Sequence, residues 1–487
     1  MSSRRIRHHG TGYALGCDHL RLGSFCKLFP GLKARESSKE DAQEEAREIG
    51  EVGRLMHDTD DSSPDGSLPA GYAFFSQLVD HDMILGTEIG LDQEQLPEHK
   101  LVKLANLRSP SLDLHCLYGL GPGAAPFLYD PDEPGCLASG NGDHDDDVTR
   151  TRHGLALIGD PRNDENLLIS QMHLLFIRFA NKVFRATRDA GDPSPFTKAQ
   201  IKVRHHYQYL VAHDLLKRIC DPGIYEFAHD QLRKGKFPVF YQRESLQSFP
   251  IPIELSAAAF RVGHTLLRSK YQINEQQSEI DLLDLPMIDP DHPAVPESLV
   301  VDWRYFFELD DDIEPNRCKA FNLKYMDGLI RKPGTTSGTE THSVLGSLAY
   351  RDILRGHVLG VPEGPQVAQA LKEAGYPINP AQNLDFHSID GWTSVDNLVR
   401  RRILTAPPLL FYILREAEIV GEGERLGPVG SAILLEVFLG ILSGCKTSFL
   451  NPKWKFSLDP EIAPRTSALG TRLFDMADLV RYTLADD

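Results

Sequence analysis

The chain has 487 residues, of which 41% are hydrophobic and 25% are charged, a composition typical of a globular protein with a large core. Its net charge of −17 and its lack of a long basic run argue against nucleic-acid binding. The first residues contain no apolar run of signal-peptide length. The longest apolar stretch, residues 429–442, carries Glu436 and is too short to span a bilayer. We therefore expect a cytoplasmic protein without a transmembrane segment.

Residues 1–70 are polar, Gly-rich and acidic, which predicts an N-terminal surface arm. Residues 71–487 show apolar positions at helical spacing and few alternating strands, which predicts one large, mainly α catalytic domain with little β. The clearest apolar stripe follows Leu167. Further helices are expected over residues 197–219, 253–270, 341–357, 364–374, 395–404, 408–420 and 429–443.

The first segment whose side chains could take part in catalysis is residues 74–85. On a helix, Gln77 and His81 lie one turn apart with Asp80 beside them, whereas Asp82 is rotated by about 100° and points elsewhere. A lone histidine on such a helix is more often structural. The dense polar group within an apolar stripe nevertheless favours a cavity that holds a base, an amide and a carboxylate.

Residues 257–267 place His264 beside Gly263, which would let a flat ring approach closely. On a helix, His264 would share a face with Phe260 and Leu267. Taken alone, this pattern also fits a histidine of the core.

Two further segments carry charge where a helix is expected. Asp352 lies on an apolar stripe and needs a partner, either a neighbouring arginine or the outer N–H of a metal-bound histidine. Arg162 and Glu165 lie three residues apart where a long helix begins, a place that also suits acidic residues without any site.

These segments resemble, in their order along the chain, the animal-type haem peroxidases of the peroxidase–cyclooxygenase superfamily. The likeness is closer to the bacterial and fungal-type branch and covers about residues 70–460. It implies a helical domain with a haem between a distal and a proximal helix. It rests on the motifs QLVDHD (77–82), SPSLDLHCLYG (109–119), RNDE (162–165), FRVGHTLL (260–267) and RDILRG (351–356).

The resemblance implies a role for each matching residue. His264 would ligate the haem iron, and His81 would be the distal acid–base group. Arg162 would be the distal arginine, and Gln77 would orient a water or halide. The cofactor would be haem b.

The remaining matches concern how the haem and a calcium ion are held. The implied roles are ester bonds to the haem from Asp80 and Glu165, propionate contacts from Arg261 and Arg355, support of the proximal histidine by Asp352, and calcium ligation by Asp82, Ser109, Ser111 and Asp113.

Three positions depart from the family pattern. Asp352 stands where asparagine is usual, and Asn166 stands where some members have a methionine that forms a sulfur link to haem. His115 replaces the usual serine or aspartate of the calcium loop. A neutral imidazole is a poor ligand for calcium, which prefers oxygen, so this substitution argues against the ion.

The function expected from the sequence is a haem-dependent peroxidase. It would reduce hydrogen peroxide and oxidise a small-molecule reductant or a halide through a ferryl intermediate. A fatty-acid dioxygenase is an alternative, but that class needs a tyrosine on the proximal helix, and residues 261–263 are Arg, Val and Gly. A non-catalytic haem-binding scaffold and an all-α protein without cofactor also remain open.

Overall fold

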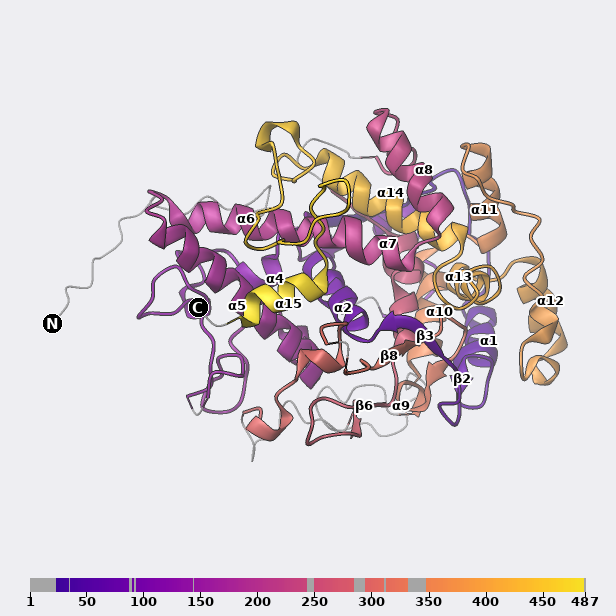
Figure 1. Ribbon diagram of the computed structural model, residues 1–487. Coiled ribbons are helices and arrows are strands. Elements are labelled where there is room, and N and C mark those ends of the chain that lie inside the picture. Colours follow the sequence, from indigo (N-terminus) through magenta and orange to yellow (C-terminus); the bar gives the residue numbers. More distant parts are fainter. Residues whose placement is uncertain are drawn as a thin grey trace.

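The computed structural model describes residues 23–34, 36–86, 90–91, 93–142, 144–242, 249–283, 294–310, 312–331 and 347–485. Within these residues the chain is mainly α-helical, as predicted (Figure 1). The helices are α1 (Lys39–Gly50), α2 (Gly71–Met83), α3 (Glu98–Leu101), α4 (His115–Tyr118), α5 (Leu167–Asp189), α6 (Pro195–Leu210), α7 (Leu216–Ile219), α8 (Pro222–Arg233), α9 (Asp327–Arg331), α10 (Leu348–Leu359), α11 (Gly364–Glu373), α12 (Asn397–Thr405), α13 (Leu409–Ile419), α14 (Pro428–Gly444) and α15 (Met476–Leu484). None of them is both long and apolar enough to cross a bilayer.

The strands of the described residues are short and join segments that are distant in sequence. One three-stranded sheet and three strand pairs are present. They are formed by β4 (Ala105–Asn106), β1 (Gly23–Cys26) and β5 (Ile251–Pro252), by β2 (His57–Asp58) with β9 (Tyr325–Met326), by β3 (Asp65–Pro69) with β8 (Arg317–Lys319), and by β6 (Lys270–Tyr271) with β7 (Ile280–Asp281). The predicted small β content is therefore confirmed.

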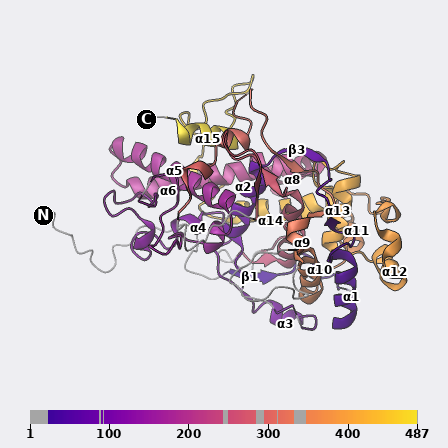
Figure 2. The same ribbon diagram turned by 90° about the horizontal axis from the view of Figure 1, so that it is seen from below.

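The described residues between 23 and 70, expected to form a surface arm, contribute to the same core as the rest. Helix α1 packs along α10 and also contacts α12, as Figure 2 shows. Its buried side chains include Ala42, Ala46 and Ile49, which lie four and three residues apart. Most residues of α1 are polar, so the overall composition of the segment did not indicate that one face of the helix is buried. The proposed boundary at residue 70 stays a prediction.

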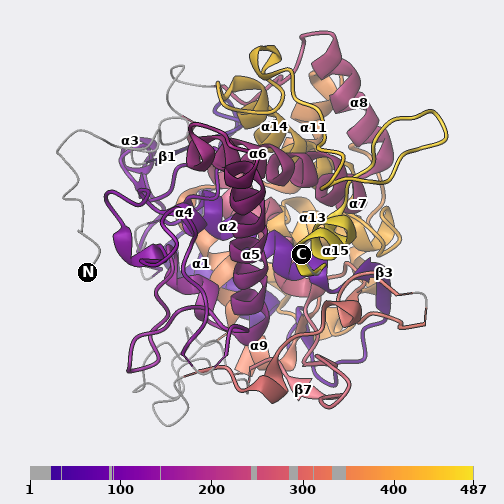
Figure 3. The same ribbon diagram turned by 60° about the vertical axis from the view of Figure 1, so that its left-hand side comes forward.

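Helix α5 packs against both α2, which carries Gln77 and His81, and α6, and Figure 3 looks onto α5 with α2 beside it. The rings of Phe75 on α2 and Phe176 on α5 stack with centroids 5.8 Å apart. At the start of α2, a side chain at Gly71 would overlap the ring of Phe307, so only glycine lets the helix approach so closely.

The segment expected as one helix over residues 253–270 is irregular. A π-helical turn, η4 (Leu255–Ala259), is followed by a 3₁₀-helix, η5 (Arg261–Leu266). In a 3₁₀-helix residues three apart eclipse each other, so Arg261 and His264 share a face. The predicted α-helical stripe of Phe260, His264 and Leu267 is therefore wrong. Irregular turns of this kind are frequent at functional sites.

Candidate functional site

His81 lies near the end of α2 with only 5% of its surface exposed. Burial, and then the positive charge of Arg162, lower the pKa of His81 from 6.5 to about 4. The ring is therefore neutral at physiological pH and can accept a proton.

A hydrogen-bond chain fixes which nitrogen of His81 carries the proton. His81 Nδ1 lies 2.7 Å from Asn163 Oδ1, and Asn163 Nδ2 lies 3.0 Å from Nδ1 of His173. Burial lowers the pKa of His173 to about 4, so this ring is also neutral and its Nδ1 accepts from the Asn163 amide. With its amide nitrogen engaged, Asn163 offers only its oxygen to His81. Nδ1 of His81 must then donate, which leaves its Nε2 as the base.

Arg162 is held beside His81 by a capped turn. The carboxylate of Asp160 caps the 3₁₀ turn η2 (Pro161–Asp164) by accepting from the Arg162 backbone N–H at 3.0 Å. The same carboxylate accepts from Arg162 Nε at 3.1 Å and Nη2 at 2.8 Å, while Nη2 also donates to the His81 carbonyl at 3.1 Å. Asp160 is fully buried, and sequence reasoning missed it although it precedes the predicted arginine.

The distal polar groups predicted from the sequence lie close to one another. Gln77 Nε2 donates to Glu165 Oε1 at 2.5 Å, which joins α2 to the start of α5. Asn166 caps α5 by accepting from the backbone N–H of Ile169 at 3.1 Å. This cap fixes where α5 begins, so that Glu165 lies just before its first turn. The charge of Asp80 acts on Arg162.

His264 on η5 is oriented by a buried carboxylate. Its Nδ1 lies 2.7 Å from Asp352 Oδ2 on α10, as expected if this carboxylate supports the histidine. Burial alone would raise the pKa of Asp352, but His264 and then Arg261 lower it to about 2, so the group is an anion. Tyr325 on β9 also donates to Asp352 Oδ2, at 3.1 Å, and its ring centroid lies 6.0 Å from that of His264. No local sequence signal points to Tyr325.

Three arginines, Arg261, Arg351 and Arg355, lie close enough to Asp352 and to one another for their charges to interact. Burial, and then the charge of Arg261, lower the pKa of Arg355 to about 10. Burial also lowers the pKa of Arg351, whose buried Nε has no hydrogen-bond partner among the described residues. Arg351 directly precedes Asp352 in the sequence, where it is one of the neighbouring arginines that could pair with that carboxylate, and here it adds a third positive charge. Such a cluster suits a ligand that carries carboxylates.

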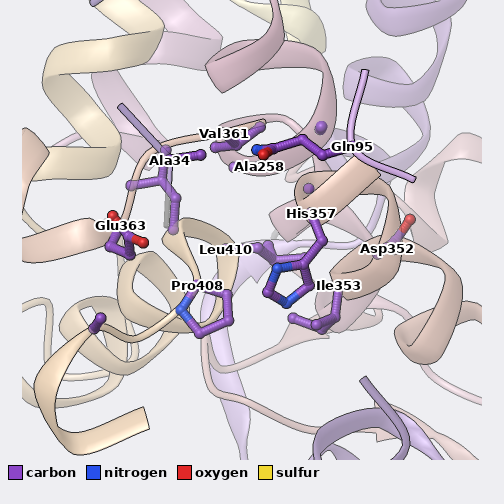
Figure 4. A pocket seen from close by; sticks show the side chains of 14 residues that line it. Ala34, Gln95, Ala258, Asp352, Ile353, His357, Val361, Glu363, Pro408 and Leu410 are labelled. Atoms are coloured by element: carbon purple, nitrogen blue, oxygen red, sulfur yellow. The ribbon is translucent and has the colours of Figure 1, made fainter. Parts of the chain in front are cut away.

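A small cavity of about 30 Å³ lies between α10 and the start of α13 (Figure 4). Its lining includes Asp352, Ile353 and His357 of α10, together with Pro408 and Leu410. A space of this size holds at most about two water molecules. Asp352 Oδ1 is buried and has no hydrogen-bond partner in the described part of the chain. The cavity can therefore hydrate the proximal carboxylate but cannot hold a large ligand.

The segments that carry His81 and His264 adjoin, because α2 contacts η5. Burial raises the pKa of Glu165, while Arg162 and then His264 lower it, so Glu165 lies near groups from both segments. The side chain of Arg162 is 28% exposed and that of His264 is 27% exposed. A Cβ at Gly263 would meet only Ser76 Oγ, at 3.8 Å. Two imidazoles, a glycine and several arginines on adjoining segments are groups that could hold a flat anionic ring such as haem.

Comparisons with solved structures identify the fold. Peroxidase A from Dictyostelium discoideum superposes with a TM-score of 0.54 at 14% identity over 91% of this chain and 89% of that one. The chain has the haem peroxidase fold. Fatty acid α-dioxygenases share it, that of Arabidopsis thaliana with a TM-score of 0.56 and 15% identity over 86% and 72% of the two chains. The fatty acid α-dioxygenase of Oryza sativa superposes with a TM-score of 0.58 at 13% identity, over 86% of this chain and 75% of that one. No protein-family model and no curated protein matches the sequence.

Proposed function

We propose that this protein is a haem peroxidase that reduces hydrogen peroxide and oxidises a small organic donor or a halide. The observation that carries the proposal is a neutral, buried His81 whose Nε2 is left as a base by Asn163, with the guanidinium of Arg162 beside it. Binding a haem without turnover would require neither the base nor the arginine.

In this proposal His264 would hold haem b as a ligand of its iron, because its Nδ1 is engaged with Asp352 and its Nε2 is free for this role. A bound haem supplies the redox chemistry that splits the O–O bond. His81 Nε2 takes the proton from the inner oxygen of peroxide and returns it to the outer oxygen. Arg162 keeps its charge and stabilises the negative charge that develops on the outer oxygen.

The other site residues position these groups. Asp352 orients His264 and gives its ring more imidazolate character than an asparagine would. Arg261 and Arg355 would hold the propionates of a bound haem. The carboxyl groups of Asp80 and Glu165 could each form an ester with a haem methyl group, in which a methyl C–H bond is lost and hydrogen peroxide takes the two electrons and becomes water. Gln77 orients a water or halide and holds Glu165 in place.

A fatty-acid dioxygenase remains the second candidate because two α-dioxygenases share the fold. That chemistry needs a tyrosine close to the haem. The residue that shares the face of His264 is Arg261, and the hydroxyl of the nearby Tyr325 donates to Asp352. These contacts favour the peroxidase.

The test uses the haem-loaded protein. We expect a Soret band and peroxide-dependent oxidation of guaiacol, with His81→Ala keeping the band and losing about 10²–10⁴-fold in turnover. His153→Ala, at an exposed histidine, is the matched control. A protein that binds no haem, or turnover unchanged in His81→Ala, contradicts the proposal. Oxygen uptake with linoleate in the absence of peroxide would establish the dioxygenase instead.

A further inference from the structure

Asp82 on α2 has a hydrogen-bond donor on each of its carboxylate oxygens. Oδ2 accepts at 3.0 Å and Oδ1 at 3.2 Å from backbone N–H groups at the start of α4. Asp82 is one of the calcium ligands expected from the sequence, and the other three lie together, with Ser109 Oγ 2.7 Å from Ser111 Oγ and 3.3 Å from Asp113 Oδ2. Calcium binding by these four residues stays a prediction. A buried carboxylate is ordinarily satisfied as Asp82 is, with donors divided between its two oxygens.

Asp352 on α10 is arranged differently, because two donors share one of its oxygens. His264 Nδ1 lies 2.7 Å and Tyr325 Oη lies 3.1 Å from the same atom, Oδ2. Asp352 is fully buried, and its other oxygen, Oδ1, has no hydrogen-bond partner among the residues that the structure describes. Hydrogen bonds from a hydroxyl to a carboxylate are usually about 2.5–2.7 Å long. The longer Tyr325 contact indicates that the two donors compete for Oδ2 and that His264 has the larger share.

The hydroxyl of Tyr325 is held at this carboxylate by the packing of its strand. Tyr325 lies on β9, which pairs in parallel with β2, and its backbone N–H donates to the carbonyl of Met56 at 2.7 Å. Its side chain is fully buried, and its ring centroid lies 6.0 Å from that of His264. Within the described part of the chain, the bond to Asp352 is the one hydrogen bond that this hydroxyl makes. A buried, fixed hydroxyl with a single acceptor acts on that acceptor alone.

The hydrogen bond from His264 to Asp352 decides how much electron density the imidazole can give to a bound iron. An anionic acceptor draws the Nδ1 proton towards itself and gives the ring imidazolate character, which stabilises the ferric state and lowers the reduction potential. A second donor on the same oxygen removes part of this acceptor strength, so Tyr325 opposes Asp352. The opposition matters here because an aspartate stands where the family resemblance expects asparagine, which is a weaker acceptor.

We propose that Tyr325 is a positioning residue that raises the reduction potential of a haem held by His264, because it shares Oδ2 of Asp352 with the proximal ring. The inference deepens the proposed function and rests on it in one respect, the ligation of haem iron by His264. A higher potential makes the oxidised haem a stronger oxidant. Tyr325 thus widens the class of donors that the enzyme can oxidise towards phenols and halides that give up electrons less readily.

The first test is the reduction potential of the haem-loaded Tyr325→Phe protein, measured by spectroelectrochemistry without peroxide. Phenylalanine keeps the ring beside His264 and removes only the hydroxyl, so the potential should fall below that of the wild type. The iron–histidine stretching frequency of the ferrous protein, measured by resonance Raman spectroscopy, should rise, because a ring with more imidazolate character binds the iron more tightly. A potential equal to or above that of the wild type overturns the proposal.

Tyr72→Phe is the matched control, because Tyr72 is also a buried tyrosine that donates to a buried aspartate. Its hydroxyl lies 2.8 Å from Asp214 Oδ2, and this carboxylate also accepts from Arg218 and from the backbone N–H of Met476. Removing the Tyr72 hydroxyl should leave the potential unchanged. An equal fall in Tyr72→Phe and Tyr325→Phe contradicts the proposal, since loosened packing would then explain both.

A double-mutant cycle tests whether Tyr325 acts through Asp352. In the Asp352→Asn background, Tyr325→Phe should shift the potential by less than half as much as it does in the wild-type background, because the anionic acceptor is gone. Equal shifts in the two backgrounds would mean that the hydroxyl acts by another route, and they contradict the proposal.

A substitution that keeps the hydroxyl decides the matter if Tyr325→Phe does not fold. Meta-fluorotyrosine, introduced at position 325 alone, has nearly the size of tyrosine and a more acidic hydroxyl, so it is a stronger donor and should raise the potential. An unchanged or lower potential overturns the proposal. Haem-loaded protein without guaiacol turnover would contradict only the proposed peroxidase activity, since none of these measurements uses peroxide. A chain that binds no haem contradicts both proposals.

Discussion

Asn163→Asp is the sharpest test of how this site sets the protonation of its distal base. In the wild type, burial and the charge of Arg162 lower the pKa of His81 from 6.5 to about 4. That difference corresponds to about 3 kcal/mol against the imidazolium. His81 acts as a base only when it is unprotonated, so activity should be lost as the pH falls through its pKa. The wild-type enzyme should therefore stay active down to about pH 4.

A carboxylate at position 163 would lie in hydrogen-bond contact with His81 Nδ1, because Asn163 Oδ1 is 2.7 Å from it. An opposite charge at that distance favours the imidazolium and raises the pKa by roughly 1–3 pH units. The acid limb of the profile should then move from about pH 4 to between about pH 5 and pH 7. At higher pH, where His81 is neutral again, the variant should recover most of its activity.

The assay is the pH dependence of kcat/KM for hydrogen peroxide at a saturating concentration of donor. Asn166→Asp is the matched control, because it adds the same charge three residues away and aspartate caps α5 as well as asparagine does. An acid limb that stays near pH 4 in Asn163→Asp would refute the reasoning. So would an equal movement in Asn166→Asp, since the effect would then be one of charge and not of the hydrogen bond.

Three further predictions concern the haem itself. Asp352→Asn should raise the reduction potential of the haem iron, measured by spectroelectrochemistry, because the proximal ring loses its anionic partner; an unchanged or lower potential contradicts this. Gly263→Phe should abolish the Soret band while circular dichroism stays that of the wild type, whereas Gly263→Ala should keep it; a normal Soret band in Gly263→Phe would mean that the space beside this glycine is not used. Denaturing mass spectrometry of peroxide-treated holoprotein should show haem attached to the chain, and the double variant Asp80→Asn, Glu165→Gln should release it. Finding only free haem in the wild type excludes the ester bonds.

The sequence predicted the regular helices better than the irregular segment on which the site depends. Helices α11 to α14 begin and end within about two residues of the expected ranges, because each buries an apolar stripe that is visible in the sequence. Helix α10 matches at its C-terminal end, while residues 341–346 of the expected helix lie outside the described residues, as does Leu345 of its apolar stripe. The switch from η4 to η5 follows from hydrogen-bond register, which apolar spacing does not encode.

The sequence indicates a site residue when its side chain suits the expected chemistry and its neighbours in the chain form a motif. His81, Arg162 and His264 stand in short motifs. Asn163 also stands in a motif, but its role depends on a contact that spans 82 residues to His81, and Tyr325 acts through a contact that spans 27 residues to Asp352. Such partners depend on tertiary packing, so local patterns cannot reveal them.

The partners of the two histidines explain how similar side chains can take different roles in the proposed enzyme. His81 donates to the neutral amide of Asn163, which fixes its tautomer without favouring the imidazolium. His264 lies against the anionic Asp352, which a second donor, Tyr325, also holds. A neutral partner leaves a histidine free to gain and lose a proton, whereas a carboxylate makes it a stronger ligand for a metal. Exchanging the partners should therefore impair each function separately: an acid at position 163 would hold the proton on the distal base, and an amide at position 352 would weaken the proximal ligand. The exchange at position 163 should move mainly the acid limb of the pH profile, and the exchange at position 352 should move mainly the reduction potential. If either exchange moved both quantities, the division of roles between the two histidines would be wrong.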